Sequence, residues 1–303
     1  MKIEKWLKEN TSALGGKTVV LSGSTGGLGR ELCFYLIGLG ARLITLDRNP
    51  EKAEKLKADI LKKYPAAEIS SYFCDMEKLD EVMCAAEELK KEKIDALILN
   101  SAAYAIPKRE TKEGYNNVFT INFISPYYLL KALLPALRKR SGRAVIVGSI
   151  AHNYSKTDPE DIDFGSKNSS ALIYGNSKRY LMLSGYKLFG NEDSASLAVV
   201  HPGISFTGIT NHYPKLIFAL IKHPMKLIFM SPKKASLSIL WGLFKKTEFG
   251  FWIGPRAFDI WGRPKLKKLR SFRKEEAENV FFAAEEIYEK IERMKKNELG
   301  KDF

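Results

Sequence analysis

The sequence predicts an α/β protein built on a doubly wound parallel sheet. From about residue 17 onward, short β-branched and aliphatic runs alternate with helical segments, and a glycine-rich turn joins the first of these runs to the first helix. Strands separated by helices of this length form βαβ units, whose right-handed crossovers give a parallel sheet covered on both faces. The 303 residues are enough for one large α/β domain or two small ones.

The predicted elements follow this alternation in chain order. Strands are expected at 17–22, 42–46, 68–73, 95–100, 143–149 and 196–201. Helices are expected between them at 28–40, from Pro50 onward, and at about 76–93, 113–140 and 171–190. Residues 15–210 are therefore predicted to form one doubly wound domain.

The composition changes after this domain. Between residues 205 and 274, fifteen Lys or Arg residues accompany only two acids, Glu248 and Asp259, so this stretch holds nearly all of the net charge of +14. Residues 275–296 carry apolar side chains at helical spacing and predict an amphipathic terminal helix. We therefore expect residues 211–303 to form a basic, apolar, helical extension of the same domain that acts as a substrate lid.

The overall composition excludes several classes of protein. Apolar residues make up 45% and charged residues 28% of the chain, which argues against disordered, collagen-like and disulfide-rich proteins. The three cysteines, Cys33, Cys74 and Cys84, form no CxxC motif, and the four histidines are scattered, so no metal site is predicted. With no apolar run of signal-peptide or membrane-spanning length, we expect a cytoplasmic protein, with peripheral membrane contact left open.

The glycine-rich turn is the first candidate binding site. It lies directly between a strand and a helix and reads Ser22-Gly23-Ser24-Thr25-Gly26-Gly27-Leu28-Gly29. Glycines allow a close approach of the backbone to a pyrophosphate, and the N–H groups and dipole of the helix N-terminus favour its negative charge. The alternative is a tight strand-to-helix connection without a ligand.

The second strand ends in two residues of opposite charge, Asp47 and Arg48, which would favour different forms of a nucleotide. At this place the Asp47 carboxylate can accept hydrogen bonds from the ribose hydroxyls of adenosine and would repel a 2′-phosphate, which favours NAD. The neighbouring Arg48 could instead pair with that phosphate, so NADP stays possible. The alternative for both residues is a helix cap and a solvated charge.

Tyr174 and Lys178 are four residues apart on one predicted helix, which follows a strand that ends in Ser149. A free tyrosine has a pKa of about 10, and a neighbouring cation favours the phenolate. Tyr174 is therefore a candidate acid/base group for an alcohol proton.

These residues, in this order, resemble the short-chain dehydrogenase/reductase family, which has a Rossmann fold that binds NAD or NADP. The resemblance covers about residues 15–210. It rests on Gly23, Gly27 and Gly29, Asp75, the Asn100-Ser101-Ala102-Ala103 segment, Asn122, Ser149, the Tyr174/Lys178 pair, and His201-Pro202-Gly203 leading to Thr207. Within the family, three features are most similar to the retinol-dehydrogenase-like branch. They are the VGSIAH segment, the long separation of 25 positions from Ser149 to Tyr174, and the DIDF segment.

The resemblance implies a role for each matching residue. Tyr174 would be the acid/base, Ser149 would hold the substrate oxygen, Lys178 would bind the ribose and lower the tyrosine pKa, and Asn122 would complete a proton relay. Asp75 would contact the adenine ring, Asn100 would lie along the cofactor, and Thr207 would bond the nicotinamide carboxamide. The remaining cofactor contacts would come from Thr25, Leu28, Met76, Ala102, Pro202 and Gly203. Three positions depart from the family pattern: Ser22, Ala103 and Gly148.

The predicted function is hydride transfer between a nicotinamide cofactor and an alcohol or carbonyl substrate. The apolar character of the segment after Thr207 indicates a lipophilic alcohol, ketone or aldehyde. The alternative is a non-catalytic NAD(P)-sensing or scaffold protein with a basic tail that binds a partner. Nucleic-acid binding is not predicted, because no reading motif accompanies the charge.

The stretch from Tyr213 to Met230 has two interpretations. Its bulky apolar residues and interspersed lysines predict a helix pair lying on an anionic membrane surface. A substrate lid, or a face packed against a second subunit in a homodimer, remains the alternative.

Overall fold

The structure, a computed structural model, describes residues 2–204, 230–269 and 271–299. At its centre is one sheet of eight strands in the order β3-β2-β1-β4-β5-β6-β7-β8. The strands are β1 (Thr18–Ser22), β2 (Arg42–Asp47), β3 (Ile69–Phe73), β4 (Ala96–Leu99), β5 (Arg143–Val147), β6 (Ser196–Val200), β7 (Phe251–Ala257) and β8 (Trp261–Lys268). All neighbouring strands are parallel except β7 and β8, which are antiparallel. The predicted doubly wound parallel sheet is confirmed, with an antiparallel strand added at one edge.

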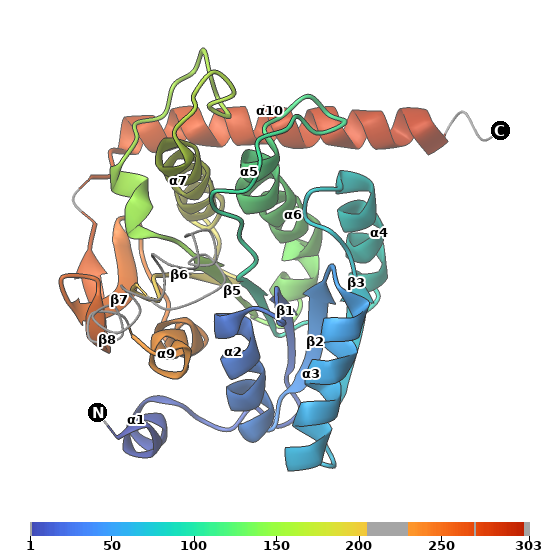
Figure 1. Cartoon of the computed structure of the whole chain (residues 1–303), viewed down its shortest axis with the longest axis vertical. Helices are drawn as coiled ribbons and strands as arrows, with labels where there is room; N and C mark the ends of the chain where they lie inside the picture. Colours follow the sequence, from blue (N-terminus) through green and yellow to red (C-terminus); the bar gives the residue numbers. More distant parts are fainter. Residues whose placement is uncertain (1, 205–229, 270, 300–303) are drawn as a thin grey trace, which may run out of the picture.

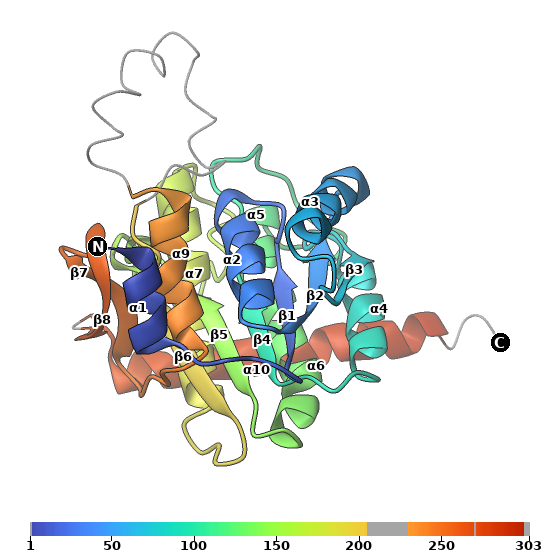
Figure 2. The ribbon, with the colours of Figure 1, turned by 90° about the horizontal axis from the view of Figure 1, so that it is seen from below.

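Helices cover both faces of this sheet (Figure 1). One face carries α1 (Ile3–Asn10), α2 (Gly27–Gly38), α3 (Pro50–Lys63) and α9 (Pro232–Gly242). The other carries α4 (Leu79–Leu89), α5 (Asn117–Phe119), the π-helical turn η1 (Thr120–Ile124), α6 (Ser125–Arg138) and α7 (Ser170–Leu188). The long terminal helix α10 (Lys274–Leu299) crosses outside this second layer, as both views show (Figures 1 and 2).

The strand sequences explain why the sheet is buried on both faces. β1 and β4 read TVVLS and ALIL, and every residue of both is buried. Continuous apolar runs of this kind suit a parallel strand between two helical layers, since neither face meets water. Two separate hydrophobic cores result, one under α2, α3 and α9 and one under α4, α6, α7 and α10.

The terminal helix is fixed to the second layer by polar contacts at its inner face. The hydroxyls of Tyr127 and Tyr128 on α6 donate to Glu285 and Glu292 on α10. The predicted amphipathic character of 275–296 is thus confirmed, because Val280, Ala284, Ile287 and Ile291 are buried while most of the charged side chains face solvent or pair with other helices.

The extension after residue 210 is not purely helical. Helices α9 and α10 agree with the prediction, but residues 251–268 form the hairpin β7–β8, which continues the sheet beyond β6. The signal for this hairpin is weak, because its turn is Phe258-Asp259-Ile260 without glycine and β8 contains Pro264. The predictions for Thr207 and for Tyr213 through Phe229 lie outside the described residues.

Candidate active site

The candidate residues gather at the carboxyl ends of the parallel strands. The chain reverses its direction of travel across the sheet at β1, which has β2 on one side and β4 on the other. In open α/β sheets a ligand crevice forms at this switch point. The glycine turn, Asp47, Asn100 and Ser149 follow four of these strand ends.

The glycine turn has the geometry that a dinucleotide requires. Gly23 has a φ of 71°, and a Cβ added at Gly29 would lie 2.1 Å from the Gly23 carbonyl oxygen. Helix α2 begins at Gly27 without a side-chain cap, so the N–H groups of its first turn are left for a ligand. This uncapped N-terminus beside a turn that excludes side chains fits the pyrophosphate of NAD or NADP.

Asp47 is tied to the glycine turn. Its carboxylate is 3% exposed and accepts hydrogen bonds from the Ser24 hydroxyl, which is very close, and from the Thr25 amide at 3.1 Å. Arg48, the next residue, is exposed and has no ion pair with the described part of the chain. The carboxylate therefore holds the turn in shape, and the guanidinium is free to meet a ligand.

Asn100 fastens β4 to the same turn. Its side-chain amide donates to the carbonyl oxygens of Ser22 and Gly23, each at 3.1 Å. In return, the Ser22 hydroxyl accepts from the Asn100 and Ser101 amides, each at 3.0 Å. Serine at position 22 thus supplies the hydroxyl that this junction needs, and its departure from the family pattern leaves the contact intact.

The residues after β3 and β4 are placed near this crevice with different exposure. Asp75 is partly buried and its carboxylate accepts from the Glu77 amide at 3.1 Å. Ala102 is exposed, whereas the Met76 side chain is buried in the hydrophobic core. A contact between Met76 and a cofactor would therefore use its backbone.

Ser149 and Tyr174 are brought together by a close approach of two helices. Ser149 caps the short helix η2 (Ile150–Asn153), and a Cβ added at Gly175 would lie 2.3 Å from the Ala151 carbonyl oxygen. Only glycine lets α7 come this near to η2. Burial raises the pKa of Tyr174 to about 12, and its hydrogen bond with Ser149 acts in the opposite direction.

Lys178 lies one helical turn after Tyr174 and is 1% exposed. Its ammonium donates to the Val147 carbonyl oxygen at 2.9 Å and is 5.9 Å from the centroid of the Tyr174 ring. Burial lowers the pKa of Lys178 to about 8. The spacing of the two residues predicted that this cation would lower the pKa of Tyr174. In the structure the ammonium donates to β5 instead, and burial of the phenol is the largest influence on the pKa of Tyr174.

Asn122 occupies the π-helical turn η1 and is completely buried. Its amide group donates to the Ala103 carbonyl oxygen at 2.8 Å and to the Ser177 hydroxyl at 3.1 Å, and its carbonyl oxygen accepts from the Ala103 amide at 2.8 Å. The side chain therefore joins the loop after β4 to helix α7. A π-turn of this kind is often found at functional sites.

Gly148 departs from the family pattern for a packing reason. A Cβ at this position would lie 2.6 Å from the sulfur of Met182 on α7. The bulky methionine fills the space that a serine side chain would need. The departure is thus coupled to a second residue that the sequence argument did not consider.

Two buried histidines, for which the sequence predicts no metal site, contact the backbone at Ser149 and at Asp259. His152 Nδ1 lies 2.6 Å from the Ser149 carbonyl oxygen, and His201 Nε2 lies 3.0 Å from the Asp259 carbonyl oxygen. Both rings contact Trp252, the His201 ring in a stacked arrangement with centroids 4.8 Å apart. Burial lowers the pKa of His152 to about 4 and that of His201 to about 3, so both are neutral. Their positions three residues after Ser149 and at the end of β6 were the available signal.

The turn after β6 also approaches the hairpin. Gly203 has a φ of 82°, and a Cβ there would lie 2.6 Å from the Ile260 carbonyl oxygen. Pro202 is buried beside it. The turn therefore packs its backbone directly on the β7–β8 loop.

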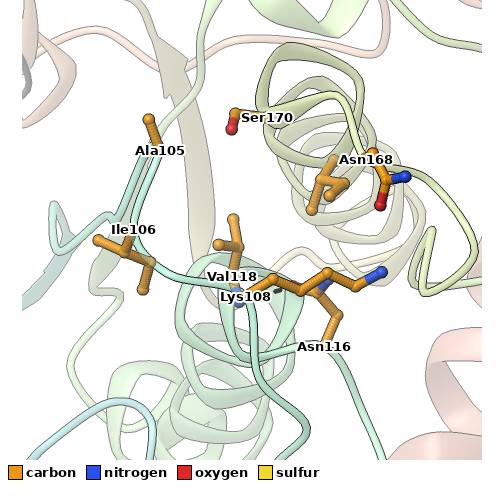
Figure 3. A pocket seen from close by; sticks show the side chains of 8 residues that line it. Ala105, Ile106, Lys108, Asn116, Val118, Asn168 and Ser170 are labelled. Carbon is orange, nitrogen blue, oxygen red and sulfur yellow. Dashed lines mark hydrogen bonds between the residues drawn. The ribbon is translucent and has the colours of Figure 1, made fainter. Parts of the chain in front are cut away.

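A small cavity of about 100 Å³ lies between the loop after β4 and the start of α7 (Figure 3). Ile173, the neighbour of Tyr174, and Ala105, the neighbour of Tyr104, contribute to its wall. The Tyr104 ring packs edge-on against Tyr174, with centroids 5.2 Å apart. The buried Asn116 amide nitrogen in the wall has no hydrogen-bond partner. The lining of this cavity contains both polar and apolar side chains.

The described part of the chain lacks two features. No group of three or more His, Cys, Asp or Glu side chains within 2–204, 230–269 and 271–299 could hold a metal ion. Among the helices that the structure describes, none is both long and apolar enough to cross a membrane.

The glycine turn at the switch point of the sheet and the group of Ser149, Tyr174 and Lys178 fit an NAD(P)-dependent oxidoreductase. The family model described as short chain dehydrogenase matches residues 17–158. Over this part the chain is similar to the short-chain dehydrogenase/reductase family, and its curated relatives include members of the same class.

Its curated relatives include dehydrogenases of lipophilic alcohols. The chain is 25% identical over 247 residues to polyprenol dehydrogenase from Homo sapiens, covering 78% of this chain and 70% of the relative. It is 27% identical over 212 residues to retinol dehydrogenase 14 from Mus musculus, covering 65% of this chain and 64% of the relative. A crystal structure of an uncharacterized protein from Mycobacterium paratuberculosis matches with a TM-score of 0.71 and 23% identity, covering 93% of this chain and 96% of that one. This last likeness concerns the fold.

Proposed function

We propose that the protein transfers a hydride between NAD and a lipophilic alcohol or carbonyl compound, with Tyr174 as the acid/base group. The observation that carries this proposal is the convergence of Ser149, Tyr174 and Lys178 at the carboxyl edge of the sheet. The names of the polyprenol and retinol dehydrogenase relatives support a lipophilic substrate. They also disfavour the alternative of a non-catalytic sensor.

The bound nicotinamide would supply the hydride acceptor or donor. Gly23, Gly29 and the first turn of α2 would hold its pyrophosphate, and Asp47 would favour the unphosphorylated ribose. Lys178, whose buried ammonium has one protein acceptor, would turn toward the ribose. Ser149 would donate a hydrogen bond to the substrate oxygen and so stabilise negative charge that develops there.

The protonation of Tyr174 favours one direction of proton transfer. With its pKa raised to about 12 by burial, the phenol keeps its proton at neutral pH and can donate it to a carbonyl oxygen. In the oxidising direction the phenolate must form first. We therefore expect the rate of alcohol oxidation to rise with pH more steeply than the rate of carbonyl reduction.

The test replaces Tyr174 with phenylalanine, which removes only the hydroxyl. Cofactor binding should persist while turnover of a hydrophobic alcohol or ketone falls by a factor of about 10² to 10⁴, measured at the nicotinamide absorbance band. Tyr154→Phe is the matched control, because the Tyr154 side chain is 56% exposed and its hydroxyl has no hydrogen-bond partner among the described residues. Near-normal turnover of Tyr174→Phe would contradict the assignment.

Cofactor preference is a second expected outcome. The unmodified protein should have the higher kcat/KM with NAD, and Asp47→Asn should narrow the difference, because it removes the charge that repels a 2′-phosphate. Asparagine keeps an oxygen that can accept from the Thr25 amide, and its NH2 group can donate to the Ser24 hydroxyl. If the unmodified protein already prefers NADP, the exposed Arg48 decides the preference, and Arg48→Gln should then lower it.

A further inference from the structure

The β7–β8 hairpin ends in two exposed aromatic rings. Phe258 is 82% exposed and Trp261 is 45% exposed, and their ring centroids are 6.1 Å apart. The hairpin is anchored at its other end, where Trp252 and Ile253 are buried in the core. It lies at the edge of the sheet, orange in Figure 1. Single exposed apolar residues are common, but this pair is distinguished by its backbone conformation, its surrounding charge and its position.

The backbone of the hairpin tip has an unusual conformation. Phe258 has a φ of 52° and Asp259 a φ of 59°, both in the left-handed region. A bulky side chain is disfavoured there, where glycine or asparagine is the usual choice. Neither local conformation nor packing in the monomer explains a phenylalanine at this position. Such an outlier points to a functional use of the side chain.

Exposed cations surround the two aromatic rings. The exposed cations Arg256, Arg263, Lys265 and Lys268 have no ion pair with the residues that the structure describes. Asp259, the one acid between residues 251 and 268, is paired with Lys267 at 2.7 Å. The tip therefore presents apolar rings flanked by unneutralised positive charge on both strands.

The hairpin tip lies against the turn that follows β6. The Asp259 carbonyl oxygen lies 3.0 Å from His201 Nε2, and the Ile260 carbonyl oxygen accepts from the Ile204 amide at 3.4 Å. The tip thus packs against the turn after β6, which borders the candidate active site. A surface that held the tip would lie close to this turn.

We propose that the tip of the β7–β8 hairpin, residues 256–265, docks on an anionic lipid surface. Phe258 and Trp261 enter the boundary between headgroups and acyl chains, where aromatic rings are favoured, and the cations contact anionic headgroups. Each cation near such a surface raises binding by roughly five-fold, an effect that salt weakens. Single-stranded nucleic acid suits the tip less well, because it prefers a groove of cations with rings open for stacking.

The test is co-sedimentation of the full chain with phosphatidylcholine vesicles, with and without about a third of phosphatidylserine, at low and high salt. Binding to the anionic vesicles should be salt-sensitive. It should fall at least about ten-fold in the double variant Phe258→Asn, Trp261→Thr. Asparagine tolerates the left-handed conformation and threonine suits a strand, so this variant should fold normally. Phe282→Ser is the matched control, because Phe282 is 66% exposed on α10 and should not affect binding.

A charge variant separates attraction from insertion. Arg256→Gln, Arg263→Gln and Lys265→Gln together should weaken binding to anionic vesicles strongly, whereas Lys52→Gln, Lys55→Gln and Lys139→Gln, which remove the same charge from α3 and the end of α6, should not. Tryptophan emission should shift to shorter wavelength on addition of vesicles, and the shift should be lost in Trp261→Thr. Binding equal to the unmodified protein in the aromatic variant would overturn the proposal, as would an absence of binding at low salt. Tighter binding to single-stranded RNA than to vesicles would also overturn it.

This inference does not depend on the proposed reaction, because vesicle binding is measured without substrate. Turnover of a short water-soluble alcohol should be unchanged in the aromatic and charge variants. Loss of that turnover in Tyr174→Phe with vesicle binding retained would show that the two activities are separate.

Discussion

Replacing Lys178 with methionine should make the protein more stable and inactive. The ammonium is 1% exposed and donates to the Val147 carbonyl oxygen. Burial lowers its pKa from the usual 10.5 to about 8, a difference that corresponds to about 3 kcal/mol of unfavourable free energy at neutral pH. Methionine removes the charge but leaves the Val147 oxygen without this donor, which costs about 1–3 kcal/mol. The expected net gain in unfolding free energy is about 1 kcal/mol.

The pH dependence of this gain has a definite sign. Below pH 8 the lysine is charged in both the folded and the unfolded chain, so its full cost is present. Between about pH 8 and 10.5 the unfolded chain binds more protons, and the stability of the unmodified protein therefore rises with pH. The advantage of Lys178→Met should accordingly shrink across this window.

The assay is urea unfolding of both proteins at neutral pH and at about pH 10, together with turnover at the nicotinamide band. Lys131→Met is the matched control. The Lys131 ammonium is paired with Glu285 at 2.6 Å, so its loss should lower stability slightly and leave turnover intact. A Lys178→Met protein that is less stable by more than about 1 kcal/mol, or that keeps its turnover, would refute this reasoning.

Two further outcomes are expected. Burial lowers the pKa of His152 from 6.5 to about 4, so the unfolded chain takes up a proton before the folded chain as the pH falls through this window. The free energy of unfolding should therefore drop by about 2 kcal/mol near pH 5. Denaturation curves of His152→Gln should show a smaller drop over the same pH range. Gly29→Ala should weaken NAD binding at least about a hundred-fold in a fluorescence titration, because its Cβ would lie 2.1 Å from the Gly23 carbonyl oxygen. Gly15→Ala, where a Cβ meets nothing within 4 Å, should bind normally, and equal affinities of the two variants would contradict the role of the turn.

The sequence predicted the parallel part of the sheet from local patterns. The strands β1 to β6 are short apolar runs between helical segments, and their parallel arrangement follows from the βαβ crossovers, whereas their order was shown only by the structure. The glycine turn, Asp47 and Ser149 were found in the same way, because each stands at the end of a strand, and Tyr174 and Lys178 were found by their spacing of four residues on one helix. These features are local in the chain, so one sequence was enough to find them.

The tertiary structure decided what depends on contacts between distant segments. The hairpin β7–β8 has no strong turn signal and joins the sheet through β6, whose last residue, Val200, pairs with Ile253. Gly148 has its reason in Met182, and the buried histidines act on the backbone around Ser149 and Asp259. None of these partners is marked by spacing along the chain.

The protonation of the site depends in the same way on burial. Residue spacing alone predicted that Lys178 would lower the pKa of Tyr174. In the folded chain the ammonium donates to Val147 and the phenol is desolvated, so the pKa rises instead. Spacing on a helix places two groups on one face, but their distance from water and from third partners is fixed only when the surrounding elements pack. The sequence by itself therefore determined which groups form the site, and the packing around them determined their charge.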